Sequence, residues 1–175
     1  MFVTHGAIRG QLSTLIVKSE RDLAIKYQKI LVPLDGSELG EAAVAHVMYL
    51  ALLSGADVML LCVVPTIENV VGSSQIRIPI DIQWDVLSAR AHQYLTGVAR
   101  RSGWGASKIH VLVETGSVAE IILAVAEREQ MDLIAMSTHG RSGVRRWVLG
   151  SVAEKVLHAA STPVLLIRSG SIGGQ

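Results

Sequence analysis

The sequence has only one cysteine in 175 residues, so no disulfide can form within the chain. Cys62 lies in an aliphatic run, where it is most simply a small buried hydrophobic side chain. It has no nearby partner at the spacing of a metal site. A chain without disulfides fits a reducing compartment, and we expect a cytoplasmic protein.

The sequence also lacks an excess of either charge. Sixteen basic residues balance fifteen acidic ones, for a formal charge of +1. This balance provides no global field to attract nucleic acid or an anionic membrane. Arg141, Arg145 and Arg146 form a local basic group, but aromatic residues make up only 4% of the chain and none interleave with these arginines in a binding pattern. We therefore expect solvated loop charges there, and no nucleic-acid partner.

No apolar run is long enough to cross a membrane without interruption. The longest candidate, Ala42 to Val64, is broken by Ser54, Gly55, Ala56 and Asp57, so a helix followed by a buried strand is the better interpretation. Near the N-terminus, Gln11 to Val17 is too short and polar for an export signal. We expect no membrane association.

The pattern of Gly, four residues, Gly-Lys-Ser/Thr that marks a phosphate-transferring loop is missing. The histidines are scattered, and they form no nucleophile and base pair at a known spacing. The sequence therefore contains no evident catalytic machinery, and slow hydrolysis of a bound nucleotide is the most activity we would expect.

What the sequence does contain is apolar residues. They make up half of the chain, and the mean hydropathy is +0.42, as in parallel sheets whose strands are covered on both faces. Helical patterns separate five short apolar runs, which predicts a single α/β domain with a doubly wound, five-stranded parallel sheet. The predicted strands are 29–34, 57–64, 108–113, 132–136 and 163–167.

A loop rich in glycine leads into the last predicted helix. Gly140 and Gly143 allow tight turns and a close approach of a ligand to the backbone. Gly150 and Ser151 then begin the helix, whose first amides would suit a phosphate. Ser151 and Glu154 also form a capping box, which needs no ligand. The same five residues, Gly-Ser-Val-Ala-Glu, recur at 116–120, and there we expect only helix capping, by Ser117 with Glu120.

Asp35 follows the first predicted strand, at the end where open α/β sheets bind ligands. It could also serve only the turn with Gly36 and Ser37. Ser37 is the predicted cap of a helix that ends near Gly55. The first 27 residues have mixed character, with Leu12, Leu15 and Ile16 weakly spaced as a helical face, and we expect a loosely attached extension there.

Two segments carry a family resemblance. The run from Met136 to Ala160, with Thr162 to Val164, resembles the C-terminal signature of the universal stress protein family, as does Val32 to Ser37 near its start. Nucleotide-binding members of that family have Gly, two residues, Gly, nine residues, then Gly-Ser. This chain matches that pattern except at Ser137, which replaces the first glycine.

The resemblance implies an adenine nucleotide alpha hydrolase-like fold with strand order 3-2-1-4-5. It assigns residues 28–168 to the family domain, with 1–27 as an extension and 169–175 as a flexible tail. It implies ATP, with or without Mg²⁺, at the carboxyl ends of strands one and four. The residues implied for this site are Pro33, Asp35, Val63, Met136, Ser137, His139, Gly140, Arg141, Gly143, Gly150, Ser151 and Val152.

The resemblance further implies a homodimer through the last strand, Val164, Leu165, Leu166 and Ile167. This strand is apolar, and we expect it at the sheet edge, where it would be a template for pairing. The leading hypothesis is a cytoplasmic, ATP-binding regulator of the stress response. The alternative is a dimeric stress-response interaction protein that binds no nucleotide, which Ser137 favours.

Overall fold

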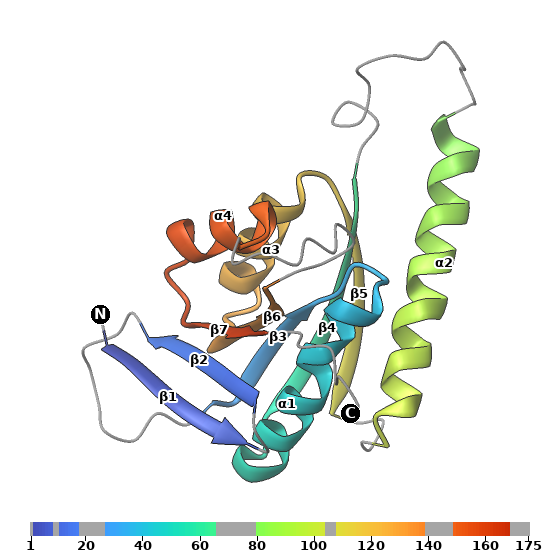
Figure 1. The fold of residues 1–175 in the computed structure, drawn as a ribbon. Coiled ribbons are helices and arrows are strands. Elements are labelled where there is room, and N and C mark those ends of the chain that lie inside the picture. The colour runs from blue at the N-terminus through green and yellow to red at the C-terminus, as the bar shows by residue number, and fades with distance from the viewer. Residues whose placement is uncertain are drawn as a thin grey trace, which may run out of the picture.

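The computed structural model describes residues 2–8, 11–17, 27–65, 80–103, 108–138 and 149–168. It forms one sheet flanked by helices (Figure 1). The strands are β1 (Phe2–Ile8), β2 (Gln11–Val17), β3 (Lys29–Pro33), β4 (Asp57–Val64), β5 (Ile109–Thr115), β6 (Leu133–Ser137) and β7 (Val164–Ile167). The helices are α1 (Glu38–Ser54), α2 (Ile80–Arg101), α3 (Val118–Arg128) and α4 (Ser151–Ala159).

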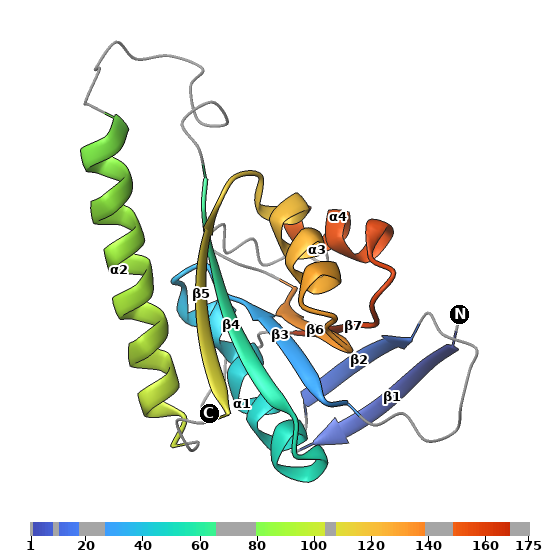
Figure 2. The same cartoon turned by 180° about the vertical axis from the view of Figure 1, so that it is seen from behind.

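The sheet has seven strands in the order β1-β2-β7-β6-β3-β4-β5. The five strands from β3 to β7 pair in parallel, and their order is 3-2-1-4-5. This part of the prediction is confirmed. The two remaining strands, β1 and β2, extend the sheet beyond β7 (Figure 2).

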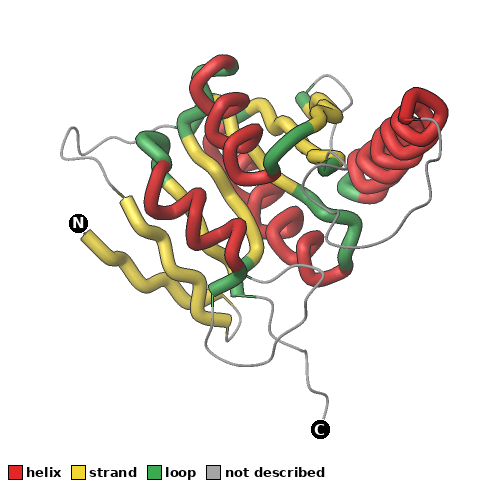
Figure 3. The backbone as a smooth tube through the Cα atoms, turned by 90° about the horizontal axis from the view of Figure 1, so that it is seen from above, coloured by secondary structure: helices red, strands yellow, loops and turns green. Residues whose placement is uncertain are grey.

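Both faces of the parallel sheet are covered, as its unbroken apolar strands require. Ile30 and Val32 of β3 lie in a cluster with Ala43 and Val47 of α1 and with Leu95 of α2, which we call the α1/α2 core. Leu31, between them, lies in the opposite cluster with residues of α3 and α4, such as Ile122 and Val156, which we call the α3/α4 core. Figure 3 shows helices on both sides of the sheet.

Helix α1 begins and ends at the predicted residues. The Ser37 hydroxyl accepts a hydrogen bond from the Gly40 amide, 3.0 Å away, as an N-cap does. At the other end, Gly55 has a φ of 74° and its amide donates to the Ala51 carbonyl. This is the left-handed C-cap that glycine favours.

The first residues of the chain differ from the prediction. Residues 2–8 and 11–17 form an antiparallel hairpin, β1–β2, so the weak helical face expected at Leu12, Leu15 and Ile16 is wrong. Strand β2 pairs antiparallel with β7. The expectation that the last strand lies at the sheet edge is therefore also wrong, because β7 has β6 on one side and β2 on the other. The predicted tail, 169–175, lies outside the described residues.

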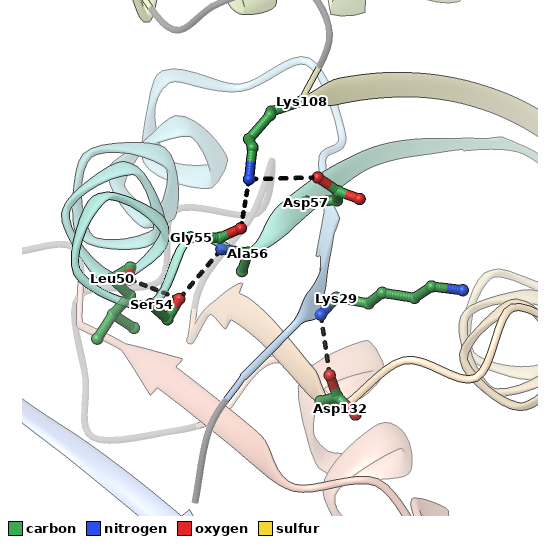
Figure 4. Close-up of polar contacts among 8 residues, drawn as sticks. All are labelled: Lys29, Leu50, Ser54, Gly55, Ala56, Asp57, Lys108 and Asp132. Atoms are coloured by element: carbon green, nitrogen blue, oxygen red, sulfur yellow. Dashed lines mark hydrogen bonds and ion pairs between the residues drawn. The ribbon is translucent and has the colours of Figure 1, made fainter.

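Polar contacts hold the amino ends of the parallel strands (Figure 4). The Asp132 carboxylate, just before β6, accepts hydrogen bonds from the amides of Gln28 and Lys29 at 2.7 and 2.9 Å. Lys108 donates to the Gly55 carbonyl, and its ammonium lies 3.9 Å from Asp57. Asp132 thus lies at the end of the sheet opposite the predicted site, as expected from its position in the sequence.

Candidate functional site

The chain turns in opposite directions after β3 and after β6. From β3 it passes through α1 to β4, and from β6 through α4 to β7, while β3 and β6 are neighbours in the sheet. The carboxyl ends of β3 and β6 therefore form the switch point, the position where open α/β sheets bind ligands. Asp35 follows one of these strands, and Ser137 ends the other.

Asp35 organises the turn after β3. Its Oδ1 atom accepts hydrogen bonds from the amide of Ser37 at 3.0 Å and from its hydroxyl at 2.6 Å. A Cβ at Gly40 would stand 2.6 Å from the same carboxylate oxygen. The structural role that the sequence allowed for Asp35 is therefore present, and Gly40, which sequence reasoning missed, lets the helix approach the carboxylate.

Ser137, which replaces the motif glycine, sits in ordinary strand backbone. It is the last residue of β6 and is buried. Among the described residues other than glycine, only Gln130 has a positive φ. A serine at this position therefore carries no cost in backbone strain. Only the bulk of its side chain could affect a ligand.

The two described ends of the loop between β6 and α4 are joined by backbone hydrogen bonds. The Thr138 amide donates to the Ile167 carbonyl, and the Gly150 amide donates to the Thr138 carbonyl, both at 2.9 Å. Sequence reasoning missed Thr138, whose position directly after an apolar strand was its only signal. The predicted site residues His139, Gly140, Arg141 and Gly143 lie outside the described residues.

Helix α4 begins differently from the prediction. Its N-cap is Gly150, which has no side chain to cap the helix, and Ser151 is its first helical residue. The predicted capping box of Ser151 and Glu154 is therefore wrong. The Thr138 carbonyl fixes the Gly150 amide, which starts the helix one residue earlier than a serine cap would. The amides of Ser151, Val152 and Ala153 point from the positive end of the helix dipole without intrahelical partners.

The same five residues begin α3 in another way. There Ser117 is the N-cap, as predicted, although its side chain makes no capping hydrogen bond, and the helix starts at Val118. Gly116 has a φ of 141°, whereas Gly150 has a φ of −61°. Glycine is thus required by the backbone conformation at 116 and by the neighbouring Thr138 carbonyl at 150.

The apolar residues predicted for the site converge on one face of the sheet. Met136 is buried in the α3/α4 core, and Val63 and Val152 pack against it. Leu149, which sequence reasoning missed, packs there too. Pro33 ends β3 in register with Leu61 of β4. The structure therefore gathers these residues near the switch point from strands β3, β4 and β6 and from helix α4.

Helix α2 places a partly buried tyrosine, Tyr94, near this end of the sheet. The Tyr94 hydroxyl is enclosed and lies close to the Glu41 carboxylate, although no hydrogen bond of full geometry forms within the described residues. Burial raises the pKa of Tyr94 well above its usual value, and the negative charges of Glu41 and Asp35 raise it further. Glu41 itself pairs with Arg101 at 3.0 Å. The Tyr94 ring packs against the α1/α2 core.

The buried hydroxyl predicts a specific loss of stability at high pH. In the unfolded chain Tyr94 ionises near its ordinary pKa of about 10, whereas the folded chain keeps the proton. The free energy of unfolding should therefore fall as the pH rises above about 10. Tyr94→Phe should reduce that fall and change stability at pH 7 by no more than about 1 kcal/mol, since the hydroxyl makes no hydrogen bond of full geometry. Urea unfolding at both pH values measures this.

Tyr49→Phe is the matched control, because it removes the same hydroxyl from a tyrosine that is half exposed. If Tyr94→Phe loses stability above pH 10 as steeply as the wild type does, the tyrosine is not the titrating group.

Two negative findings apply to the described ranges. No three His, Cys, Asp or Glu side chains there gather closely enough to hold a metal ion. Every helix there is too short or too polar to cross a bilayer. The described part of the site therefore offers backbone amides, the Asp35 carboxylate, the hydroxyls of Ser137 and Ser151, and apolar side chains.

Comparisons with known proteins agree with this architecture. The universal stress protein family model matches residues 26–168. Universal stress protein MJ0531 of Methanocaldococcus jannaschii is 31% identical over 167 residues, covering 93% of this chain and 92% of that protein. MJ0577, from the same archaeon, has a solved structure with a TM-score of 0.70 at 27% identity, covering 83% of this chain and 99% of that one. A universal stress protein solved in complex with cAMP has a TM-score of 0.61 at 22% identity, and the match covers 83% of this chain and all of that one. At this identity the similarity shows the fold alone.

Proposed function

Because the chain belongs to the universal stress protein family, we propose that it binds ATP at the carboxyl ends of β3 and β6 and acts as a nucleotide-dependent regulator of the stress response. The observation that carries this proposal is the N-terminus of α4. Its N-cap, Gly150, has no side chain to occupy the first amides, and the Gly150 amide donates to the carbonyl of Thr138, which follows β6. We place this function in the cytoplasm, in keeping with the single cysteine.

The phosphates would bind the first turn of α4. The amides of Ser151 and Val152 supply donors at the positive end of the helix dipole, which favours an anion. Ser151 is exposed and adds a hydroxyl. Because the described residues hold no metal-binding cluster, any Mg²⁺ would be held mainly by the phosphates and water.

The nucleoside would bind towards β3 and β4. Val63, Met136 and Val152 offer an apolar contact for adenine on the α3/α4 face. Asp35, exposed at the end of β3, would accept hydrogen bonds from the ribose hydroxyls. We propose binding rather than rapid turnover, since the sequence holds no lysine of a phosphate-transferring loop.

Asp35→Asn tests the nucleoside contact. The asparagine keeps an oxygen that can accept from the Ser37 amide but removes the charge. We expect ATP binding to weaken by about 1–3 kcal/mol, the value of a hydrogen bond to a charged group, while the melting temperature without ligand stays nearly constant. Calorimetric titration with ATP measures the loss, and cAMP in place of ATP tests whether the triphosphate is needed.

The control for this experiment is Asp57→Asn, a partly exposed carboxylate at the amino ends of the strands. Its ATP affinity should equal that of the wild type. Unchanged affinity in Asp35→Asn would assign Asp35 to the turn alone.

The second candidate is an interaction protein that binds no nucleotide, and Ser137 is the residue that favours it. Since the backbone at Ser137 is unstrained, only its side chain could exclude a nucleotide. A thermal melt with saturating ATP separates the two functions, because a ligand of the folded state raises stability. A wild-type protein without a shift, together with a Ser137→Gly variant that gains one, would replace the first function by the second.

A further inference from the structure

The N-terminal hairpin lies against the strand that would otherwise be an edge of the sheet. Strand β2 runs antiparallel to β7, with Thr14 opposite Leu166, Leu15 opposite Leu165 and Ile16 opposite Val164. All four residues of β7 are buried. The universal stress protein domain alone, residues 26–168, does not include this hairpin.

The backbone groups that the hairpin satisfies follow from the strand geometry. The carbonyls of Pro163 and Ile167 accept hydrogen bonds from Ile134 and Thr138, on the β6 side. Because successive residues of a strand direct their backbone groups to alternate sides, Leu165 faces β6 as well, and Val164 and Leu166 face β2. Without the hairpin, the amide and carbonyl groups of Val164 and Leu166 would form an unpaired, apolar edge.

The hairpin is held mainly through this one edge. Among the described elements, β1 makes its main contacts with β2, and β2 makes its main contacts with β1 and β7. Figures 1 and 2 show the two strands projecting from the side of the sheet. An isolated two-stranded hairpin is only marginally stable in water, so its attachment is easier to break than that of a strand covered by helices.

We propose that the hairpin is a detachable cap on β7, and that a second copy of this chain pairs with β7 when the cap leaves. The antiparallel orientation of β2 supports this occupant. In a two-fold symmetric pair, β7 of one copy lies antiparallel to β7 of the other, which is the orientation that β2 adopts. The cap therefore holds the same edge, in the same direction, that a symmetric partner would use.

The capped state dominates in the intact chain because the hairpin is tethered to its own edge. Tethering gives an effective concentration on the order of millimolar, well above the micromolar concentration of a second copy in a typical experiment. The extension is also not confined to this chain. The match with MJ0531 covers 93% of the chain, so about 12 of the 175 residues, or 7%, lie outside it. Because 25 residues precede the family match, part of the N-terminal extension must lie within the match with MJ0531.

A pair of proline substitutions in the full chain tests the cap. Thr14, opposite Leu166, directs its amide to β7, so Thr14→Pro removes a hydrogen bond between the cap and the edge. His5, opposite Thr14 in β1, directs its amide away from β2, so His5→Pro is the matched control. Sedimentation at about 50 μM should show monomers for the wild type and His5→Pro, and a concentration-dependent dimer for Thr14→Pro. A dimeric wild type, or a folded and monomeric Thr14→Pro, would overturn the proposal.

A disulfide tests whether the cap belongs to the same chain. In a Cys62→Ala background, Leu15→Cys and Leu165→Cys place two cysteines opposite one another, within the Cα separation that a disulfide spans. Oxidation should give a monomer with an internal disulfide, identified by mass spectrometry. The same oxidation of Ser13→Cys with Leu165→Cys, two residues out of register, should give little. A disulfide-linked dimer from the first pair would show that the hairpin pairs with another copy, and would overturn the cap.

Discussion

Replacing Gly150 by valine is expected to abolish stabilisation by ATP and to lower the free energy of unfolding by about 1–3 kcal/mol. A Cβ at this position would stand 3.1 Å from the Thr138 carbonyl oxygen, and the methyl groups of valine would add to the crowding. The hydrogen bond from Gly150 to Thr138 would have to lengthen. The start of α4 would then move, and with it the amides proposed to hold the phosphates.

Gly116→Ala is the matched control, since Gly116 begins the same five residues. Its φ of 141° and the nearby Ile121 side chain, 3.1 Å from an added Cβ, should cost about 1–3 kcal/mol of stability. This loss has no connection with α4. Thermal melts of both variants, with and without saturating ATP, should therefore show similar destabilisation, with an ATP-dependent shift only in Gly116→Ala. If the melting temperature of Gly150→Val rises with ATP as much as that of the wild type, the first amides of α4 do not bind the phosphates.

Replacing Asp132 by alanine should lower the free energy of unfolding by about 1–3 kcal/mol without changing ATP affinity. Its carboxylate accepts from two successive amides, those of Gln28 and Lys29, at the start of the central strand β3. In the variant, water must replace the carboxylate as the acceptor for these two amides. Urea unfolding, together with calorimetric titration of ATP, measures both quantities.

Asp57→Ala provides the comparison at the same end of the sheet. The Asp57 carboxylate lies 3.9 Å from the Lys108 ammonium, and both side chains are nearly half exposed. Such a pair contributes no more than about 1 kcal/mol, so Asp57→Ala should be clearly more stable than Asp132→Ala. Equal losses of stability in the two variants would mean that the hydrogen bonds to Asp132 stabilise the fold no more than the exposed ion pair of Asp57 does.

The parallel part of the fold could be predicted because its strands are short and apolar throughout. Ile30, Leu31 and Val32 are all fully buried, since the two helical layers cover both faces of β3. The strand order was implied by the family resemblance, and it placed Asp35 and Ser137 at the switch point. The helix caps at Ser37 and Gly55 followed from local rules alone.

The start of α4 could not be predicted from its residues. Gly-Ser-Val-Ala-Glu occurs twice, and the two copies begin their helices at different positions. The difference comes from the Thr138 carbonyl, which binds the Gly150 amide across a loop. No local rule contains that contact. The position of Tyr94 near Asp35 likewise depends on how α2 packs, which periodicity does not specify.

The N-terminal hairpin has a local signal in the sequence, but a competing pattern overlaps it. Two seven-residue runs, 2–8 and 11–17, are separated by Arg9 and Gly10, and a two-residue connection with glycine is typical of a hairpin. The spacing of Leu12, Leu15 and Ile16 indicated a helix instead. The strand that decides between them is β7, about 150 residues later in the chain.

That separation in sequence affects how the protein is made. Hairpins form in about 1–10 μs, so β1 and β2 can pair as soon as they leave the ribosome. Their partner strand follows only when Leu166, opposite Thr14, has been synthesised, which takes roughly 8–30 s at about 5–20 residues per second. The first element to form is therefore the last to reach its place. A change that slows translation of the final strand would prolong the time during which the β1–β2 hairpin has no partner strand, without altering any contact of the finished protein.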